Sequence, residues 1–188
     1  MFKFFANCFY KKKPNQQITN YVQQFNEPIC KNLTVDVIDA CDDWELFQVV
    51  FDNICDSITD DSIEVLSRMT KGQQAIYSIW WIEAEVYNGG FNQYFFNPSC
   101  RFSEMAIEGF KHVNAPKYEK LMRQANDIYL KNKKNLAGYD NGTAEFFSQS
   151  YEERIFEECD TEFYKLDTEN PMRLYCVKYI RENVQEFL

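Results

Sequence analysis

The stretch AIYSIWWIEAEVYNGGFNQYFFN, residues 75–97, decides the fold of this 188-residue chain. Drawn as a helix, its first half is apolar on almost every side, which is typical of a helix at the centre of a hydrophobic core. Just before it, Thr70 and Gln73 have the spacing of a capping box. We therefore expect a central helix from about residue 71 to residue 88.

The glycine pair Gly89–Gly90 predicts that this helix ends in a corner. Glycine readily adopts the positive φ of a helix C-cap, and we assign that conformation to Gly89. Asn-Gly is also a hairpin signal, and FNQYFF alternates enough for a strand, so a hairpin is the alternative. From the apolar helix and the aromatic corner we also predict that four aromatic side chains are largely buried: Trp80, Trp81, Phe91 and Phe95.

The polar side chains beside the glycine corner permit two interpretations; they are Glu85, Asn88, Asn92 and Gln93. In the structural interpretation they hydrogen-bond the bare backbone of the corner, as buried amides usually do. In the functional interpretation the same groups surround the mouth of an aromatic pocket and recognise a ligand. The structural interpretation is favoured, and the functional one stays open.

Helical periodicity continues on both sides of the central helix. The further segments expected to be helical are residues 35–58 (with Thr34 as N-cap), 102–113, 116–130, 150–166 and 171–186, and the turn-rich residues 131–144 are expected to form a loop. We therefore predict an all-α chain, with a single helical domain at residues 34–188. An N-terminal extension, residues 1–33, precedes this domain.

Residues suited to catalysis or metal binding are scarce. His112 is the only histidine, and the seven cysteines include no C-x-x-C pair. No phosphate-binding or dinucleotide-binding loop motif occurs. We therefore expect no metal and no cofactor, and we favour a non-enzymatic binding protein. The enzyme alternative would use Glu85 as acid or base, beside Asn88 and Gln93, in an aromatic pocket.

Cysteine usage and hydropathy bear on the location of the protein. An odd number of cysteines without paired spacing is typical of reduced, mostly buried thiols, so we expect a cytoplasmic protein. The apolar run in MFKFFANCFYKKKP is too short to span a membrane, and it lacks the cleavage site of a signal peptide. The net charge of −9 disfavours nucleic acid as a direct partner.

Charged residues are segregated along the chain. Residues 32–67 contain no lysine or arginine but ten carboxylates: Asp36, Asp39, Asp42, Asp43, Glu45, Asp52, Asp56, Asp60, Asp61 and Glu64. A helical wheel separates one part of this set, Asp42, Glu45, Asp52 and Asp56, from an apolar stripe that contains Trp44, Phe47 and Phe51. A second acidic block lies at residues 152–162, and a basic block lies at residues 111–134.

The segregation of charge predicts a surface for a basic protein partner. We assign to that surface Asp42, Glu45, Asp52, Asp56, Asp60, Asp61, Glu153, Glu157 and Asp160. An ordinary solvated surface would also be acidic in many proteins. Contact between the acidic block of one copy and the basic block of another would instead give a homodimer.

Three segments resemble the bacterial DNA-mimic protein family over about residues 64–187: LSRMTKGQQAIYSIWW, WWIEAEVYNGGFNQYFFN and EECDTEFYKLDTENPMRLYCVKYIREN. The signature that carries the resemblance is Glu85, Asn88, Gly89, Gly90, Phe91, Gln93, Tyr94 and Phe95. The resemblance implies a helical fold and, for at least one member, binding of a transcription factor by imitation of the charge of DNA. It thus implies a basic DNA-binding protein as partner. An acidic immunity or antitoxin protein would present a similar surface.

Overall fold

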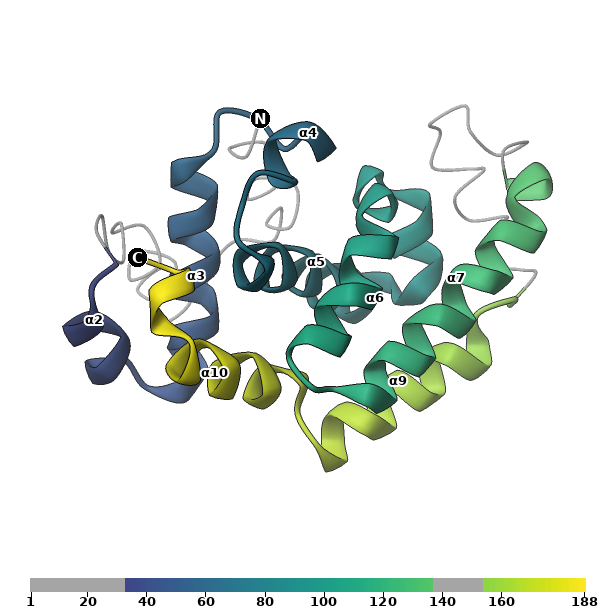
Figure 1. Ribbon diagram of the computed structural model, residues 1–188. Coiled ribbons are helices and arrows are strands. Elements are labelled where there is room, and N and C mark those ends of the chain that lie inside the picture. The colour runs from purple at the N-terminus through teal and green to yellow at the C-terminus, as the bar shows by residue number, and fades with distance from the viewer. Residues whose placement is uncertain (1–32, 137–153) are drawn as a thin grey trace, which may run out of the picture. The chain divides into compact units, whose positions relative to one another are not determined.

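The computed structural model describes residues 33–136 and 154–188, and the part Leu33–Leu188 forms one compact unit. Its helices are α2 (Val35–Ala40), α3 (Asp43–Ser57), α4 (Ile63–Leu66), α5 (Lys71–Phe96), α6 (Ser103–His112), α7 (Pro116–Leu136), α9 (Glu157–Glu169) and α10 (Met172–Glu182), with the short 3-10 helices η2 (Pro98–Phe102) and η4 (Val184–Glu186). All regular structure in the described ranges is helical (Figure 1), so the all-α prediction is confirmed and the hairpin alternative is wrong. The predicted extension lies outside the described residues, apart from Leu33.

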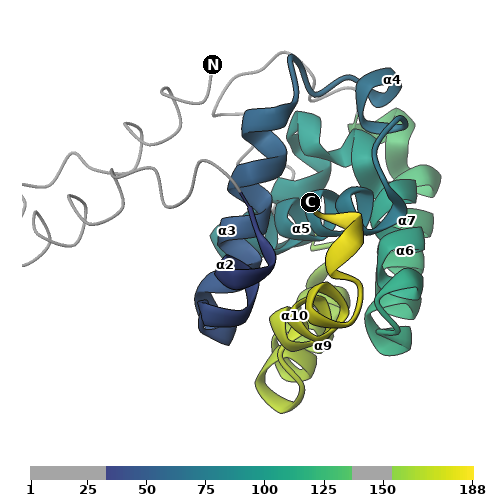
Figure 2. The same ribbon diagram turned by 60° about the vertical axis from the view of Figure 1, so that its left-hand side comes forward.

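α5 is the central helix, as predicted. It contacts α3, α6, α9 and α10, and Figures 1 and 2 show it between α3 and α6. The predicted capping box is present at its N-terminus: the Thr70 hydroxyl accepts from the Gln73 N–H at 3.1 Å, and the Gln73 side chain accepts from the Thr70 N–H at 3.1 Å. Because these bonds satisfy N–H groups that the helix itself leaves free, α5 begins where the sequence predicts.

The aromatic side chains of α5 supply much of the core. Phe91 is 1% exposed and Phe95 is 5% exposed, as predicted for both. Trp80 and Trp81 are only partly buried, so the prediction was too strong for these two residues. Trp80 stacks on Phe51 of α3 with ring centroids 3.8 Å apart, which places it at the edge of the core, where α3 and α5 meet.

The glycine corner is a kink within α5 and not the end of the helix. Gly89 is extended (φ −167°), whereas Gly90 has φ 70° and ψ −175°. The prediction of positive φ was therefore right for the corner but assigned to the wrong glycine. Helical structure resumes after the kink and continues to Phe96, because this last turn can bury Phe91 and Phe95 on one face.

The predicted helix at residues 35–58 is broken into α2 and α3. Thr34 caps α2 as expected, with its hydroxyl accepting from the Val37 N–H at 3.3 Å. Asp42 then caps α3, since its Oδ1 accepts from the N–H groups of Trp44 (2.7 Å) and Glu45 (3.0 Å). Asp42 is thus the cap at the start of α3, the helix that carries Glu45, Asp52 and Asp56. Trp44 lies in the first turn of α3 and is 64% exposed, so it is not buried with Phe47 and Phe51 although it has their helical spacing.

The remaining helices occur in the predicted order with shifted ends. α7 continues to Leu136, into the segment expected to be a loop, and the rest of that loop lies outside the described residues. α9 begins at Glu157, later than predicted. Its buried residues are Cys159, Phe163 and Leu166, which recur at helical spacing. The predicted last helix is present as α10 with η4 after it.

The five cysteines in the described ranges form no disulfide with one another. Cys159 and Cys176 are buried, and the other three are partly buried. Burial, together with nearby carboxylates, raises the pKa of Cys55 to about 12 and that of Cys159 to about 11. Cys8 and Cys30 lie outside the described residues.

Cys55 should therefore react slowly with iodoacetamide in the folded protein. Only the thiolate reacts, and raising the pKa from 9.0 to about 12 lowers the thiolate fraction at pH 8 by roughly 10²–10³-fold. Because the pKa is raised, the rate should keep increasing with pH above 9 and not level off there. Mass spectrometry of alkylated peptides measures the rate, with the urea-unfolded chain as the control. Equal rates in the folded and unfolded protein would contradict the expectation.

Candidate functional site

Glu85 is sealed inside the protein and joins the two parts of α5 across the kink. The residue is only 6% exposed. One carboxylate oxygen, Oε2, accepts from the Gln93 amide at 2.9 Å and the Asn97 amide at 2.8 Å, and Oε1 accepts from the Ser99 hydroxyl at 3.3 Å. Three donors from beyond the kink therefore converge on one carboxylate, which holds the second part of α5 and η2 against the first part.

The predicted polar cluster is only partly assembled. Glu85 and Gln93 come together, but Asn88 is exposed to solvent, and Asn92 lines a separate hollow. Glu85 does not line that hollow. The arrangement gives Glu85 the structural role of a hydrogen-bonded anchor for the glycine corner and does not place it at the floor of an open pocket.

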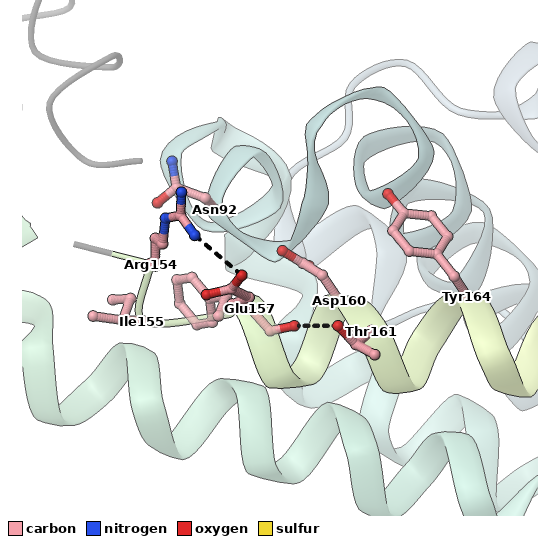
Figure 3. Close-up of a pocket in the computed structure, with 8 residues that line it drawn as sticks. Asn92, Arg154, Ile155, Glu157, Asp160, Thr161 and Tyr164 are labelled. Atoms are coloured by element: carbon pink, nitrogen blue, oxygen red, sulfur yellow. Dashed lines mark hydrogen bonds and ion pairs between the residues drawn. The ribbon is translucent and has the colours of Figure 1, made fainter. Parts of the chain in front are cut away.

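The hollow beside the kink is lined by residues of α5, α9 and the segment just before α9 (Figure 3). Its lining includes Asn92, Asp160 and Tyr164. Asp160 Oδ1 accepts from the Phe91 N–H at 2.7 Å, the first N–H after Gly90. Burial raises the pKa of the Asp160 carboxyl, and the hydrogen bond from Phe91 opposes that shift. The sequence assigned Asp160 to a partner surface, and the structure shows that it also stabilises the kink.

Within the described ranges, most carboxylates of the acidic segment, residues 36–64, have no ion-pair partner. Three of its ten carboxylates pair with arginine: Asp43 with Arg181 at 2.7 Å, Asp61 with Arg101, and Glu64 with Arg68 at 2.5 Å. The other seven make no ion pair within the described ranges: Asp36, Asp39, Asp42, Glu45, Asp52, Asp56 and Asp60. The segment therefore presents a concentrated negative charge on α2, α3 and the turns that flank them.

Individual carboxylates of the acidic segment differ in their surroundings. Asp52 is partly buried and accepts from the Gln48 amide at 2.9 Å, and burial raises its pKa. Asp60 is exposed, and hydrogen bonds from the Ser62 hydroxyl and N–H lower its pKa. Glu45 and Asp56 are exposed on α3. These two are the carboxylates of α3 most available to a partner.

The second acidic block does not merge with the acidic segment. Glu153 lies outside the described residues, and Glu157 pairs with Arg154 at 3.3 Å. α10 packs on α3, whereas α9 packs on α7, and Figure 1 shows α10 between α3 and α9. The two acidic regions are therefore separate surfaces of the helical unit.

The basic block lies on α6 and α7. Arg123 pairs with Glu119 at 2.9 Å and with Glu108 at 3.2 Å, and Lys111 lies 3.8 Å from Glu108. Lys117, Lys120 and Lys131 are exposed. α6 and α7 lie on the side of α5 away from α3 (Figure 1), so the charge segregation seen in the sequence persists in space.

An aromatic groove that the sequence did not predict lies beside the acidic segment. It is formed by α3, α5 and the α9–α10 corner, with a volume of about 470 Å³, and its lining includes Trp44, Trp80, Tyr87 and Arg173. Trp44 is 64% exposed and Tyr87 is 53% exposed. Periodicity could not reveal this groove, because the spacing of Trp44 with Phe47 and Phe51 within α3 predicts a buried side chain, whereas Trp44 is exposed in the first turn of that helix.

Arg173 of α10 organises one side of the aromatic groove. Its Nε and Nη2 donate to the two carboxylate oxygens of Glu83 at 2.6 and 2.8 Å, and its Nη1 donates to the Trp44 carbonyl at 3.0 Å. Its guanidinium carbon lies 4.7 Å from the centre of the Trp44 ring and 5.5 Å from that of Phe47. The Arg173–Glu83 pair is therefore well satisfied and leaves no net charge.

The sole histidine belongs to a surface network. His112 Nε2 is 2.7 Å from the Tyr179 hydroxyl and 4.0 Å from Glu186. Tyr179 also donates to Glu186, which accepts from the Gly72 N–H at 2.6 Å. These contacts connect α6, α10 and η4 to the start of α5. Among the described residues there is no group of three potential metal ligands, and no helix there is long and apolar enough to cross a bilayer.

Comparison with known proteins assigns a family. The family model described as DMP19-like protein matches residues 67–183, which is more than half of the chain. Neither the comparison with curated proteins nor that with solved structures gave a match. The matched part contains α5 to α10, including the kink and the Glu85 anchor, whereas the acidic segment lies before it. On this match, the chain belongs to the family of DMP19-like proteins.

Proposed function

We propose that this chain is a non-enzymatic binding protein and that its acidic segment occupies the basic DNA-binding surface of a protein partner. The observation that carries the proposal is the set of seven carboxylates without an ion-pair partner in the described ranges, on a segment with no lysine or arginine. The negative electrostatic field of these carboxylates attracts a basic surface and accelerates association. Membership of the DMP19-like family supports the same function, since the chain resembles DNA-mimic proteins.

The geometry supports imitation of the negative sign of DNA's charge more than imitation of the spacing of its phosphates. Glu45 and Asp56 are eleven residues apart on α3, which corresponds to about 17 Å at the helical rise, with Asp52 between them. Along one DNA strand, by contrast, successive phosphates are about 3.4 Å apart along the helix axis. A partner would therefore meet a sparser row of charges, and its basic side chains would have to reach individual carboxylates.

The enzyme alternative receives little support from the described residues. It requires Glu85 in an open pocket with Asn88 and Gln93, whereas Glu85 is sealed by three donors and Asn88 is exposed to solvent. The homodimer alternative retains a physical basis, because acidic α2–α3 and basic α6–α7 could meet between two copies. An acidic immunity or antitoxin protein would bind its partner by the same chemistry.

Affinity capture from the source cell at low salt tests the proposal. The wild type should retain a DNA-binding protein that a variant with Asp36, Asp39, Glu45 and Asp56 changed to Asn or Gln loses. The association rate with the captured protein should fall about tenfold or more between low and high salt, because exposed charges are screened. Light scattering of the free protein in both conditions tests the homodimer.

A matched control removes the same charge elsewhere. A variant with Glu158, Glu162, Glu169 and Glu182 changed to Gln removes the same number of negative charges but leaves the acidic segment intact. It should retain the captured protein. If both variants and the wild type capture the same proteins, or none, the acidic segment is only a solvated surface and the proposal fails.

A further inference from the structure

We propose that the aromatic groove beside the acidic segment receives an arginine side chain of the basic partner, an inference that rests on the proposed function and makes its partner more specific. The groove has two edges, because Trp44 of α3 and Tyr87 of α5 both expose more than half of their surface. A single exposed aromatic side chain is ordinary, but two that border one hollow form a potential contact site.

The charge inside the groove favours a cation. Glu83 and Arg173 neutralise each other. Asp167 accepts hydrogen bonds from the hydroxyls of Tyr87 and Tyr118 and from the Met172 N–H, and none of these donors carries a positive charge. The described lining thus has one uncompensated negative charge, and the exposed Asp42 and Glu45 flank Trp44 in the acidic segment.

The surrounding groups favour arginine over lysine. A guanidinium is planar, stacks on aromatic rings and donates in a fork, whereas an ammonium is compact and strongly hydrated. The protein already stacks one guanidinium, that of Arg173, on the Trp44 ring. A second guanidinium can contact the exposed part of Trp44 and the ring of Tyr87, and it can donate to Asp167. A carboxylate has about four acceptor sites, and three donors leave capacity for one more.

The groove adds a chemical preference that the acidic segment lacks. Exposed carboxylates attract arginine and lysine about equally, because their attraction depends mainly on charge. Stacking on Trp44 would contribute about 1 kcal/mol for arginine, which corresponds to about fivefold in affinity. Basic DNA-binding surfaces present arginine to phosphates and bases, so such a preference would select among basic proteins.

Three synthetic peptides of equal length test this inference on the full chain at low salt: hexa-arginine, hexa-lysine and neutral hexa-citrulline. Calorimetry should give about fivefold or more tighter binding of hexa-arginine than of hexa-lysine, and no comparable binding of hexa-citrulline. Trp44→Ala should lower the affinity for hexa-arginine to that for hexa-lysine and leave the latter unchanged. Leu130→Ala, which removes a side chain of similar exposure on α7, is the matched control and should change neither affinity.

A second measurement covers the case in which Trp44→Ala disturbs the fold. The chain has three tryptophans, so its NMR spectrum has three indole N–H signals, and Trp44→Phe assigns one of them. Arginine amide should shift the Trp44 signal of the wild type, and lysine amide at equal concentration should shift it much less.

The outcomes separate the two proposals. If both cationic peptides bind equally and Glu45→Gln with Asp56→Asn weakens both, the acidic segment binds cations but the arginine site is refuted. Binding of hexa-citrulline as tight as that of hexa-arginine would identify an apolar groove and also refute it. If neither cationic peptide binds at low salt, both the groove and the proposed function are refuted.

Discussion

Gly90→Ala should lower the free energy of unfolding by about 3 kcal/mol or more. The backbone of Gly90 (φ 70°, ψ −175°) lies in a region that residues with a Cβ rarely adopt. An added Cβ would also lie 2.6 Å from Asp160 Oδ2 and 2.8 Å from Asp160 Cγ. Asp160 cannot retreat without cost, because its other oxygen holds the Phe91 N–H. Backbone strain and side-chain overlap therefore act together.

Urea denaturation monitored by circular dichroism measures this loss of free energy. In a thermal melt, the melting temperature should fall by about 6 °C or more. Gly89→Ala is the matched control at the neighbouring position. Gly89 has a φ of −167°, which any residue adopts, so its substitution should cost clearly less. Equal losses for the two variants would show that Gly90 is not the residue that requires glycine.

Arg173→Ala should lower the free energy of unfolding by about 3 kcal/mol. The side chains of Arg173 and Glu83 are only 19% and 12% exposed, so truncation leaves the Glu83 carboxylate nearly buried without its counter-ion. The variant also loses the hydrogen bond to the Trp44 carbonyl and the contacts with the rings of Trp44 and Phe47. Removal of one partner of a buried pair is costly even where the intact pair contributes little.

Urea denaturation also measures this effect, with the exposed pair Arg68–Glu64 as the comparison. Both side chains of that pair are more than 70% exposed. Arg68→Ala should therefore change stability by less than about 0.5 kcal/mol. The double variant Arg173→Met, Glu83→Leu should recover much of the loss, because it leaves no buried charge. A similar small loss for Arg173→Ala and Arg68→Ala would contradict our account of the buried pair.

Local sequence signals predicted the centre of the fold well. The capping box of Thr70 and Gln73 depends on residues three apart, and the all-round apolar pattern of α5 spans several turns, so both can be read without tertiary information. The buried stripe of α9 has the same periodicity. Glu85 is sealed, but its three donors are side chains and not the backbone of the corner that the structural interpretation named, and no local pattern indicated two of them, Asn97 and Ser99.

Tertiary contacts decide the features that the sequence did not predict. Which of Gly89 and Gly90 takes positive φ depends on Asp160, about seventy residues later, which binds the Phe91 N–H. Around Asp42 the continuous apolar spacing favours a single helix, but the Asp42 side chain caps α3 and a new helix begins there. The aromatic groove requires Arg173 from α10 beside Trp44 and Glu83, and no local pattern connects these residues.

α10 attaches the acidic segment to the part of the chain that matches the family. Arg181 donates to the carbonyls of Ile38 (2.7 Å) and Cys41 (2.8 Å), and Arg173 donates to that of Trp44. These acceptors are backbone groups, which every amino acid supplies. Apart from Asp43, which pairs with Arg181, and Asp42, which caps α3, evolution can therefore exchange the exposed acidic side chains of α2 and α3 without loosening this attachment. The acidic segment has the properties of a replaceable module, in which the charge pattern, and with it the choice of the proposed partner, can diverge on an unchanged scaffold.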